Sequence, residues 1–394
     1  MIAIPDVTFD PTTHGSLPHP PAPQDAPFED NGETTISAHY LRNHTLVPEF
    51  AAEYTLGNEL GSGGFGFVVS ATRNSDQMEV AVKFIFRDKV PIHGWAKDPE
   101  LGPIPMEIYA LKNVNHPNII RFLGTYQDLK YYYLVMELHG TPWSANNPLL
   151  NKNNGQSNMM DAIAMATMNQ RNGAENGGGS ASTTSSGSSS FLGTTSSSSS
   201  SLSQLADGDE PSKPSLLVRR TSCDLFECIE HHSKLTESQA RLIFSQVVDC
   251  VHYLNSKGIC HRDIKDENIV IDNDFVVKLI DFGSAVIIPP QGKVFDRFYG
   301  TINYASPEIL KGEQYRAEAA EIWSLGILLY TILYGEAPFN DPIQAISGPY
   351  ITPHVKSSSE CLHLLNWMLA KDPEQRATIH DVMYHPWIAG VSMP

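Results

Sequence analysis

The sequence predicts an α+β fold in which a small antiparallel sheet with one helix precedes a mainly helical part. Short runs rich in β-branched and aromatic residues, separated by turn residues, occupy positions 54–138. From position 223 onward, apolar residues recur at spacings of three and four, as they do along one face of a helix. A glycine-rich segment, residues 61–66, lies between two predicted strands, whereas a dinucleotide-binding fold would place its glycines before a helix.

The first part contains five predicted strands and one predicted helix. The strands cover residues 54–60, 68–72, 79–85, 119–126 and 131–138. The helix covers residues 106–112, where the apolar side chains have helical spacing. A loop with several Pro and Gly residues, 91–105, precedes this helix and is interpreted as an insertion.

The second part contains five predicted helices and one hairpin. The helices cover residues 223–232, 238–257, 322–333, 357–369 and 379–384. The hairpin strands, 269–271 and 276–280, flank a turn at 272–274. The apolar run at 322–333 is shorter than the ~20 residues that span a bilayer, so we expect a buried helix there.

Three segments have compositions that do not predict a packed core. Residues 1–53 are rich in Pro, Asp, Thr and His, which predicts a disordered tail. Residues 144–215 are dominated by Asn, Gly and Ser and cannot bury enough apolar surface to offset the entropy lost on ordering. We therefore expect a disordered insertion within one folded domain, residues 54–388, followed by a short tail at 389–394.

Charge and cysteine content narrow the class of protein. The net charge of -17 argues against nucleic acid or an anionic membrane as the main partner. Acidity suits a basic peptide substrate, but it is also common in soluble proteins. The five cysteines include no C-x-x-C pair, so we expect a reducing compartment without disulfides or a zinc site. No secretory signal is expected either, and we place the protein in the cytoplasm, with the nucleus as a second location.

Residues 261–268 and 281–283 carry side chains that suit phosphoryl transfer. Both stretches lie at the ends of the predicted hairpin, which brings four polar side chains together: Asp263, Lys265, Asn268 and Asp281. Asp263 can accept a proton from an attacking hydroxyl, and Lys265 can neutralise a migrating phosphate. Asn268 and Asp281 offer hard oxygen ligands to Mg²⁺.

The pattern H-R-D-x-K-x-x-N at 261–268, followed by D-F-G at 281–283, resembles the catalytic core of eukaryotic protein kinases. The resemblance implies a bilobed protein kinase fold, with an N-lobe and hinge at 54–140 and a C-lobe at 223–388. It implies ATP and Mg²⁺ as cofactors. The implied catalytic residues are Asp263, Lys265 and Asn268, and the implied metal ligands are Asn268 and Asp281.

The resemblance also implies which residues bind ATP. Three glycines at G-x-G-x-x-G spacing would cover the phosphates, and Lys83, held by Glu107, would orient them. Without the resemblance, Lys83 reads as a solvated lysine at a sheet edge and Met136 as an ordinary buried methionine. The predicted nucleotide site comprises Leu60, Gly61, Ser62, Gly63, Gly64, Phe65, Gly66, Phe67, Val68, Ala81, Lys83, Glu107, Met136, Glu137 and Leu138.

Residues 300–308 match the end of a kinase activation segment, with Ser306 in place of the usual Ala. The resemblance implies that Glu308 pairs with Arg376. Lys265 and Thr301 favour serine or threonine, rather than tyrosine, as the acceptor. The expected partners are therefore protein substrates with Ser or Thr acceptors.

Two departures from the kinase pattern affect regulation. Glu321 stands where most kinases have an Asp that braces the catalytic loop, and it is one methylene longer. Residues 285–298 contain no Ser, Thr or Tyr, so the usual activating phosphorylation site is missing. Its usual partner, Arg262, is present. We hypothesise that activity needs no phosphate in the activation segment, with Asp296 as the partner of Arg262.

Further matches resemble PAS-domain-containing kinases and lie at 136–140, 261–271, 279–285, 315–316 and 321–326. This resemblance implies a preference for basic residues near the acceptor, with Glu267 and Glu336 as contacts. The motif R-R-T-S at 219–222 is either a phosphorylation site for such a kinase or the N-cap of the next helix.

Two alternatives share parts of this pattern. A pseudokinase scaffold that binds nucleotide and protein partners usually lacks Lys83, Asp263 or Asp281, all of which are present here. A small-molecule kinase would lack the segment at 301–308. For the protein kinase we expect a monomer with neither nucleic acid nor membrane as a partner.

Overall fold

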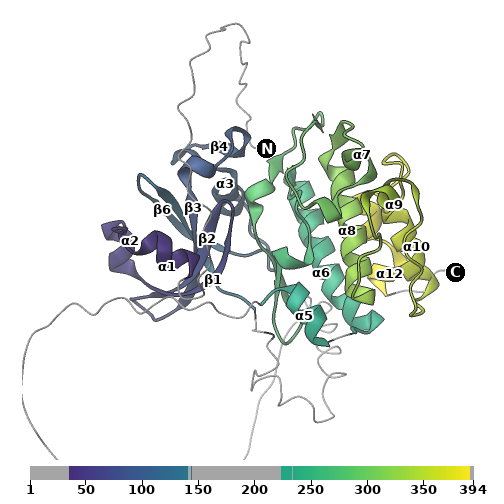
Figure 1. The fold of residues 1–394 in the computed structure, drawn as a ribbon, viewed down its shortest axis with the longest axis horizontal. Coiled ribbons are helices and arrows are strands. Elements are labelled where there is room, and N and C mark those ends of the chain that lie inside the picture. Colours follow the sequence, from purple (N-terminus) through teal and green to yellow (C-terminus); the bar gives the residue numbers. More distant parts are fainter. Residues whose placement is uncertain (1–34, 141–142, 144–222, 233, 391–394) are drawn as a thin grey trace, which may run out of the picture. The chain divides into compact units, whose positions relative to one another are not determined.

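The computed structural model describes residues 35–140, 143, 223–232 and 234–390. The described residues belong to one compact unit with a sheet-bearing N-lobe and a helical C-lobe (Figure 1). The predicted α+β, bilobed architecture is therefore confirmed. The predicted insertion, the R-R-T-S motif and most of the C-terminal tail lie outside the described residues.

The N-lobe sheet has five antiparallel strands in the order β1-β2-β3-β7-β6. Their bounds are Tyr54–Gly63 (β1), Gly66–Arg73 (β2), Glu79–Phe86 (β3), Phe122–Gln127 (β6) and Tyr131–Glu137 (β7). Because successive side chains of a strand point to opposite faces, Val82 and Phe84 join an aromatic cluster while Ala81 and Ile85 join the main core. On the main-core face lies α3 (Met106–Asn113), the predicted helix.

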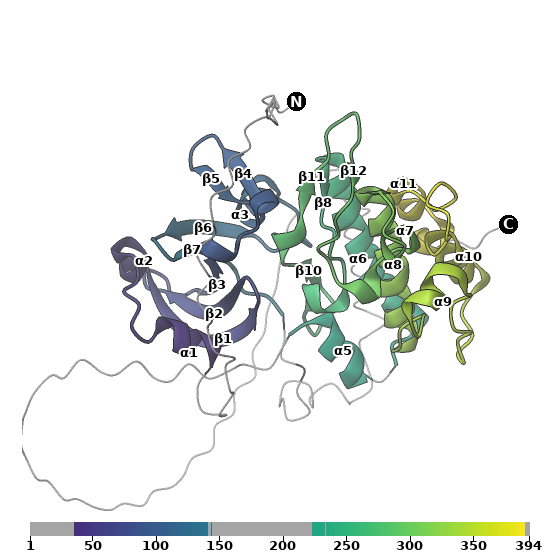
Figure 2. The same cartoon turned by 45° about the horizontal axis from the view of Figure 1, so that its top comes forward.

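Two short helices precede the sheet, where the sequence predicted a disordered tail. These helices, α1 (Ile36–Leu41) and α2 (Pro48–Glu53), lie on the aromatic face of the sheet, as Figure 2 shows. Phe50 is fully buried against the ring of Tyr54. The tail prediction is wrong for residues 35–53, because such short helices are stabilised by packing rather than by composition.

The loop predicted at 91–105 contains a β-hairpin, in which β4 (Trp95–Asp98) pairs with β5 (Gly102–Pro105). Two 3-10 turns precede it, Arg87–Lys89 and Ile92–Gly94. The Asp98 carboxylate accepts hydrogen bonds from Lys112 Nζ at 2.9 and 3.0 Å, which ties the hairpin to α3. The loop prediction is wrong here, since strands of four residues carry too little alternation to be recognised.

The C-lobe is built mainly from helices, and the five predicted ones correspond to α5, α6, α8, α10 and α11. The bounds are Leu225–His232 (α5), Glu237–Ser256 (α6), Pro307–Leu310 (α7), Ala317–Tyr334 (α8), Pro342–Ser347 (α9), Ser359–Met368 (α10), Ile379–Met383 (α11) and Pro386–Ala389 (α12). Within the described ranges, α8 alone is long and apolar enough to cross a membrane, but 78% of it is buried inside the fold. It is the buried helix that the sequence predicts.

Short strand pairs carry the loops that face the N-lobe. They are β8 (Ile259–Cys260) with β11 (Val286–Ile287), β9 (Ile269–Ile271) with β10 (Val277–Leu279), and β12 (Val294–Phe295) with β13 (Tyr315–Arg316). Gly140 and Cys223 lie so close that a Cβ on Gly140 would be 2.6 Å from the Cys223 Cβ. The chain therefore leaves the hinge and enters the C-lobe at neighbouring points.

Candidate active site

The loop at 261–268 leads from β8 to β9 and ends in a 3-10 turn, Asp266–Asn268. Arg262 has a left-handed φ of 65°, and its N–H donates to Glu321 Oε2 at 2.8 Å. Burial raises the pKa of Glu321 to about 7, although backbone N–H groups of the loop oppose this shift. The expected carboxylate brace is present, with Glu in the place of Asp.

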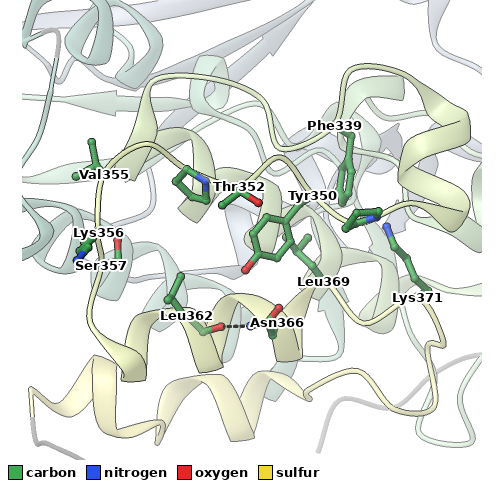
Figure 3. Close-up of a pocket in the computed structure, with 12 residues that line it drawn as sticks. Phe339, Tyr350, Thr352, Val355, Lys356, Ser357, Leu362, Asn366, Leu369 and Lys371 are labelled. Atoms are coloured by element: carbon green, nitrogen blue, oxygen red, sulfur yellow. Dashed lines mark hydrogen bonds between the residues drawn. The ribbon is translucent and has the colours of Figure 1, made fainter.

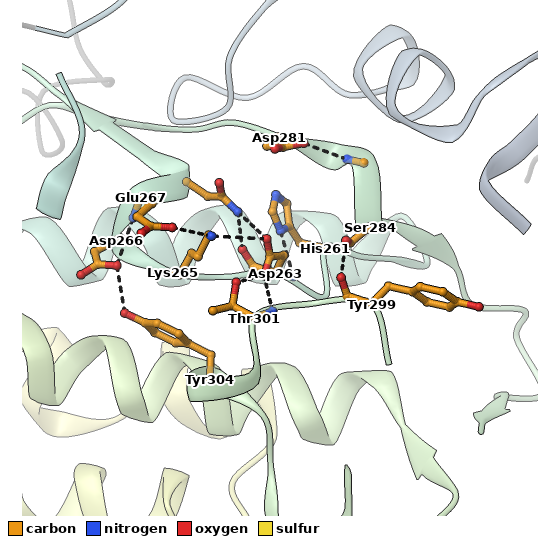
Figure 4. A network of polar contacts seen from close by, with 12 residues as sticks. His261, Asp263, Lys265, Asp266, Glu267, Asp281, Ser284, Tyr299, Thr301 and Tyr304 are labelled. Carbon is orange, nitrogen blue, oxygen red and sulfur yellow. Dashed lines mark hydrogen bonds and ion pairs between the residues drawn. The ribbon is translucent and has the colours of Figure 1, made fainter. Parts of the chain in front are cut away.

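Asp263 receives hydrogen bonds from two sides (Figure 4). Asn268 Nδ2 donates to Asp263 Oδ2 at 2.9 Å and to its backbone O at 2.8 Å. Thr301 donates to Asp263 Oδ1 through its N–H at 2.8 Å and through its hydroxyl at 2.9 Å. Lys265 Nζ lies 4.0 Å from Asp263 Oδ2 and 2.5 Å from Glu267 Oε2. The three predicted catalytic residues thus lie together.

Lys83 connects the two lobes. Its Nζ lies 2.7 Å from Glu107 Oε1, on α3, and 2.8 Å from Asp281 Oδ1, which follows β10. The exposed fractions of the Lys83 and Glu107 side chains are 12% and 6%, whereas that of Asp281 is 46%. Asp281 is therefore the member of this triad that solvent or a ligand can reach.

The charges of the triad follow from burial and proximity. Burial alone would lower the pKa of Lys83, but Asp281 and Glu107 raise it above its usual range. Burial would raise the pKa of Asp281, yet the Lys83 ammonium lowers it to about 2. Burial raises the pKa of Glu107 to about 7, against the opposing effect of Lys83. Asp281 is therefore the ionised oxygen donor that a divalent cation requires.

The residues beside Asp281 fix its direction. Asp281 has a left-handed φ of 61°, which is uncommon for a residue other than glycine, and its Oδ1 accepts the Gly283 N–H at 3.2 Å. Phe282 is fully buried beside α3, and its ring meets that of His261 edge-on at 4.7 Å. This packing connects the helix that carries Glu107 to the loop at 261–268.

The predicted nucleotide site divides between the two faces of the sheet. Five of its apolar side chains pack in or against the main core: Leu60, Val68, Ala81, Met136 and Leu138. Val68 is the neighbour of Lys83 across β2 and β3. Phe67 points to the other face, where it is fully buried and stacks on Phe84 at 5.0 Å. Strand alternation turns the Phe67 side chain away from the main-core face, so only its backbone remains as the predicted nucleotide contact.

The glycines where β1 turns into β2 differ in whether packing leaves space for a side chain. A Cβ on Gly66 would lie 2.1 Å from the backbone O of Phe84, so packing excludes any side chain there. A Cβ on Gly61, Gly63 or Gly64 would meet no atom within 4 Å. Packing does not explain these three glycines, whose bare backbone leaves room for a ligand to approach.

The side chain of the predicted hinge residue Glu137 bonds to other residues of the protein. Its Oε1 accepts hydrogen bonds from Lys278 Nζ and from the Arg121 N–H, both at 2.8 Å. Its carboxylate is thus committed within the protein, and the backbone of β7 is the part of the hinge left to contact an adenine. Met136, at the back of the predicted pocket, is 7% exposed.

Comparison with known proteins identifies the family to which the chain belongs. The family model described as "Protein kinase domain" matches residues 54–168 and 208–388, more than half of the chain and every predicted site residue. The chain belongs to the protein kinase family. The match covers the segments that are predicted, by resemblance, as the glycine-rich loop (61–66), the catalytic loop (261–268) and the activation segment (281–308).

Similar curated proteins are serine/threonine kinases by name. The PAS domain-containing serine/threonine-protein kinase of Mus musculus is 35% identical over 340 residues, 86% of this chain and 19% of that protein. Serine/threonine-protein kinase PSK2 of Saccharomyces cerevisiae is 29% identical over 372 residues, 91% of this chain and 26% of that protein. Serine/threonine-protein kinase pim-2 of Danio rerio is 30% identical over 350 residues, 86% of each. The predicted resemblance is confirmed, and the chain spans about a fifth to a quarter of the first two relatives.

The kinase activation segment departs from prediction at Arg262. The Arg262 Nε donates to the Ser284 O at 2.7 Å, and its guanidinium lies over the rings of Phe295 and Tyr299, at 5.2 and 5.6 Å. In the described part of the chain the Arg262 guanidinium has these contacts and no ion pair with Asp296, so the prediction of Asp296 as its partner is wrong. Aromatic rings, rather than a carboxylate, surround the guanidinium.

The end of the activation segment is anchored as predicted. The Arg376 guanidinium donates to Glu308 Oε1 and Oε2, both at 2.9 Å, and the two side chains are 0% and 5% exposed. Arg376 also donates to the backbone O of Ala319 at 2.7 Å and of Ala370 at 3.0 Å. The pair thereby ties the activation segment to α8 and to the turn after α10.

Two further contacts of the site could not be predicted from the sequence. His93, in the turn before β4, stacks on the ring of Tyr299 at 3.9 Å. Tyr304 OH donates to Asp266 Oδ1 at 3.0 Å and so fixes the start of the 3-10 turn in the catalytic loop. Both contacts join segments far apart in the chain, where no local pattern could indicate them.

A cavity of about 630 Å³ lies in the C-lobe beside α10 (Figure 3). Its lining includes Tyr350, Leu362 and Leu369, with Lys371 at one end. No predicted catalytic or nucleotide-binding residue lines it. It is therefore separate from the predicted phosphoryl-transfer site.

Proposed function

We propose that this chain is an active serine/threonine-protein kinase that transfers the γ-phosphoryl group of ATP to Ser or Thr hydroxyls of protein substrates. The observation that carries the proposal is the contact of Lys83 with both Glu107 and Asp281. This contact requires β3, α3 and the turn after β10 to be placed as phosphoryl transfer needs them. A scaffold without turnover has no need for all three charges.

In the proposed reaction, Asp263 is the base. Its carboxylate accepts the proton of the acceptor hydroxyl while that oxygen bonds to the γ-phosphorus of ATP. The bond from this phosphorus to the bridging oxygen breaks, and ADP leaves. Thr301 and Asn268 donate to the two Asp263 carboxylate oxygens and so fix the base in one orientation. Lys265 stabilises the charge on the transferred group.

The residues also fit Mg²⁺, which protein kinases typically use with ATP. Asn268 bonds Asp263 through its amide nitrogen, which leaves its amide oxygen as a ligand atom. The Asn268 backbone O accepts the Ile280 N–H at 2.9 Å, and this places Asn268 beside the residue that precedes Asp281. A carboxylate and an amide oxygen are the hard ligands that Mg²⁺ prefers. Bound there, the ion would neutralise phosphate charge.

We further propose that substrates carry basic residues near the acceptor. The chain has a net charge of -17, which favours a cationic peptide. Glu267, within the predicted catalytic loop, is 59% exposed although it pairs with Lys265, and Glu336 is exposed. Both remain the candidate contacts for substrate basic groups.

We also propose that catalysis needs no phosphate in the activation segment. Contacts within the chain support this segment along its length. Arg262 binds the Ser284 O, His93 stacks on Tyr299, and Tyr315 OH donates to the Arg297 O at 2.9 Å. These contacts supply the ordering that a phosphate provides in other kinases.

The first experiment measures ATP-dependent phosphorylation of an Arg-rich peptide with a single Ser, alongside Thr and Tyr versions and a version with neutral flanks. We expect transfer to Ser and Thr only, with a higher KM for the neutral peptide. Asp263→Asn and Lys83→Met should each lower kcat by roughly 10²-fold or more. Nucleotide binding without any transfer by the wild type would instead establish the pseudokinase scaffold.

The second experiment treats the kinase with a protein phosphatase before the assay. We expect unchanged kcat, because the segment has no acceptor residue at 285–298. A loss of activity that maps to residues 284–301 would refute the proposal. The monomeric state and cytoplasmic location are proposals as well, to be checked by light scattering and by imaging of the tagged chain.

A further inference from the structure

The helix α1 lies against the two strands that flank the glycine-rich loop, β1 and β2 (Figure 2). It precedes residue 54, where the match to the kinase family begins. No step of phosphoryl transfer uses it. Its contacts nevertheless reach the residues immediately before and after the loop.

The first contact is a buried hydrogen bond. The Ser37 N–H, in the first turn of α1, donates to Glu59 Oε2 at 2.7 Å. Ser37 and Glu59 are 0% and 2% exposed. Glu59 stands directly before Leu60 and the loop, at an irregularity in the pairing of β1 with β2. A buried carboxylate needs a partner, and here α1 supplies it.

The second contact is aromatic. Tyr40, near the end of α1, stacks parallel to Phe67 with ring centroids 6.1 Å apart, and Phe67 stacks in turn on Phe84 at 5.0 Å. Phe67 stands directly after Gly66, at the other end of the loop. The ring that strand alternation turns away from the main-core face is thus the one that packs against α1.

The chain after α1 is itself anchored. His44 Nε2 lies 2.9 Å from Asp128 Oδ2 and 3.0 Å from the Tyr133 OH, which also donates to Asp128. These residues belong to β7 and to the turn before it. The helix is therefore a fixed part of the N-lobe, and both strand ends of the loop rest on it.

We propose that α1 positions the glycine-rich loop for ATP, with Glu59 and Tyr40 as positioning residues. Between the two strand ends, Gly61, Gly63 and Gly64 have no side chains with which to pack. The height and angle of the loop therefore depend on where its ends are held. The inference rests on the proposed function, because ATP is the ligand of the loop.

The test uses the full chain and compares a disruptive with a conservative change at each residue. Glu59→Ala removes the acceptor, whereas Glu59→Gln keeps an oxygen for the Ser37 N–H. Tyr40→Ala removes the ring, whereas Tyr40→Phe keeps it. Glu53→Ala is the matched control, because Glu53 accepts a 2.6 Å hydrogen bond from Tyr126 in the same lobe but away from the loop.

Two quantities are measured for each variant: the dissociation constant of a fluorescent ADP analogue, and KM and kcat for ATP at saturating peptide. Both alanine variants should raise the dissociation constant and KM for ATP about five- to tenfold, with kcat and peptide KM within about twofold. The Gln and Phe variants should remain close to wild type, as should Glu53→Ala.

An unchanged ATP KM in Glu59→Ala and Tyr40→Ala, or an equal rise in Glu53→Ala, would overturn the inference. If an alanine variant does not fold, the same comparison is made with Glu59→Asp, which shortens the reach to Ser37 but keeps the charge. A wild type that binds the ADP analogue without phosphorylating peptide would refute the proposed function alone, because the binding measurements would still decide the role of α1.

Discussion

Removal of the Arg376 guanidinium provides a quantitative test of the fold beneath the active site. Arg376 and Glu308 form two hydrogen bonds of 2.9 Å, and their side chains are 0% and 5% exposed. Arg376→Ala leaves the Glu308 carboxylate buried without a cation. Breaking a buried pair in this way costs about 3–5 kcal/mol of unfolding free energy. For a domain of this size we expect the melting temperature to fall by roughly 6–10 °C.

The same chain offers an exposed pair as the control. Arg316 Nη2 lies 2.8 Å from Glu374 Oε1, but the two side chains are 50% and 70% exposed. Arg316→Ala should cost less than about 1 kcal/mol, because water already solvates both charges. Differential scanning fluorimetry of both variants, confirmed by urea unfolding, measures the difference.

A double variant separates loss of the pair from the presence of an unpaired charge. Glu308→Leu combined with Arg376→Met removes both charges and should destabilise the domain less than Arg376→Ala alone. If Arg376→Ala melts within 2 °C of Arg316→Ala, or if the double variant is the least stable of the three, the reasoning from burial is refuted.

Three further predictions concern other parts of the domain. Since burial raises the pKa of Glu321 from 4.5 to about 7, the folded state retains a proton that the unfolded state loses, and stability falls as pH rises between these values. Relative to the wild type, Glu321→Gln should therefore gain up to about 3 kcal/mol of unfolding free energy as the pH rises from 5 to 8. An equal difference from the wild type at both pH values would contradict this. Phe50→Ala should cost about 3–5 kcal/mol through a cavity, whereas Tyr384→Ala, at a residue 65% exposed, should shift urea unfolding little. Asp98→Ala should lower kcat about three- to tenfold in steady-state assays, because it removes the contact between the β4-β5 hairpin and Lys112 on α3. An unchanged kcat would show that the placement of α3 does not depend on this hairpin.

The sequence alone predicted which candidate catalytic residues lie together, because most of them are close in the chain. Asp263, Lys265 and Asn268 occupy one loop, and a predicted hairpin brings Asp281 beside them. Lys83 and Glu107 are 24 residues apart on different elements, and only the resemblance to kinases pointed to their contact. The contact of Lys83 with Glu107 was therefore predicted from the family pattern and not from the spacing of residues in the chain.

What the sequence did not reveal depends on tertiary packing. The helices α1 and α2 have six residues each, too few for a clear hydrophobic period, and they are stable because the sheet offers them an aromatic face. The same packing holds the ring of Phe67 against Tyr40 of α1, a contact that the sequence did not indicate. Composition predicts how residues 35–53 would behave as an isolated peptide, whereas in the protein they pack against the sheet.

The additions to the N-lobe share one consequence for catalysis. The helix α1 meets the strand ends of the glycine-rich loop, the β4-β5 hairpin holds α3 through Asp98, and the turn before β4 reaches the activation segment through His93 and Tyr299. In kinases, activity requires α3 and the activation segment to be in place, and phosphorylation often controls that placement. Here both of these parts, and the glycine-rich loop as well, are held by contacts within the chain itself. We therefore infer that the enzyme is built to be active without an added phosphate, and that variants of these contacts should reduce activity in ways that no phosphorylation restores.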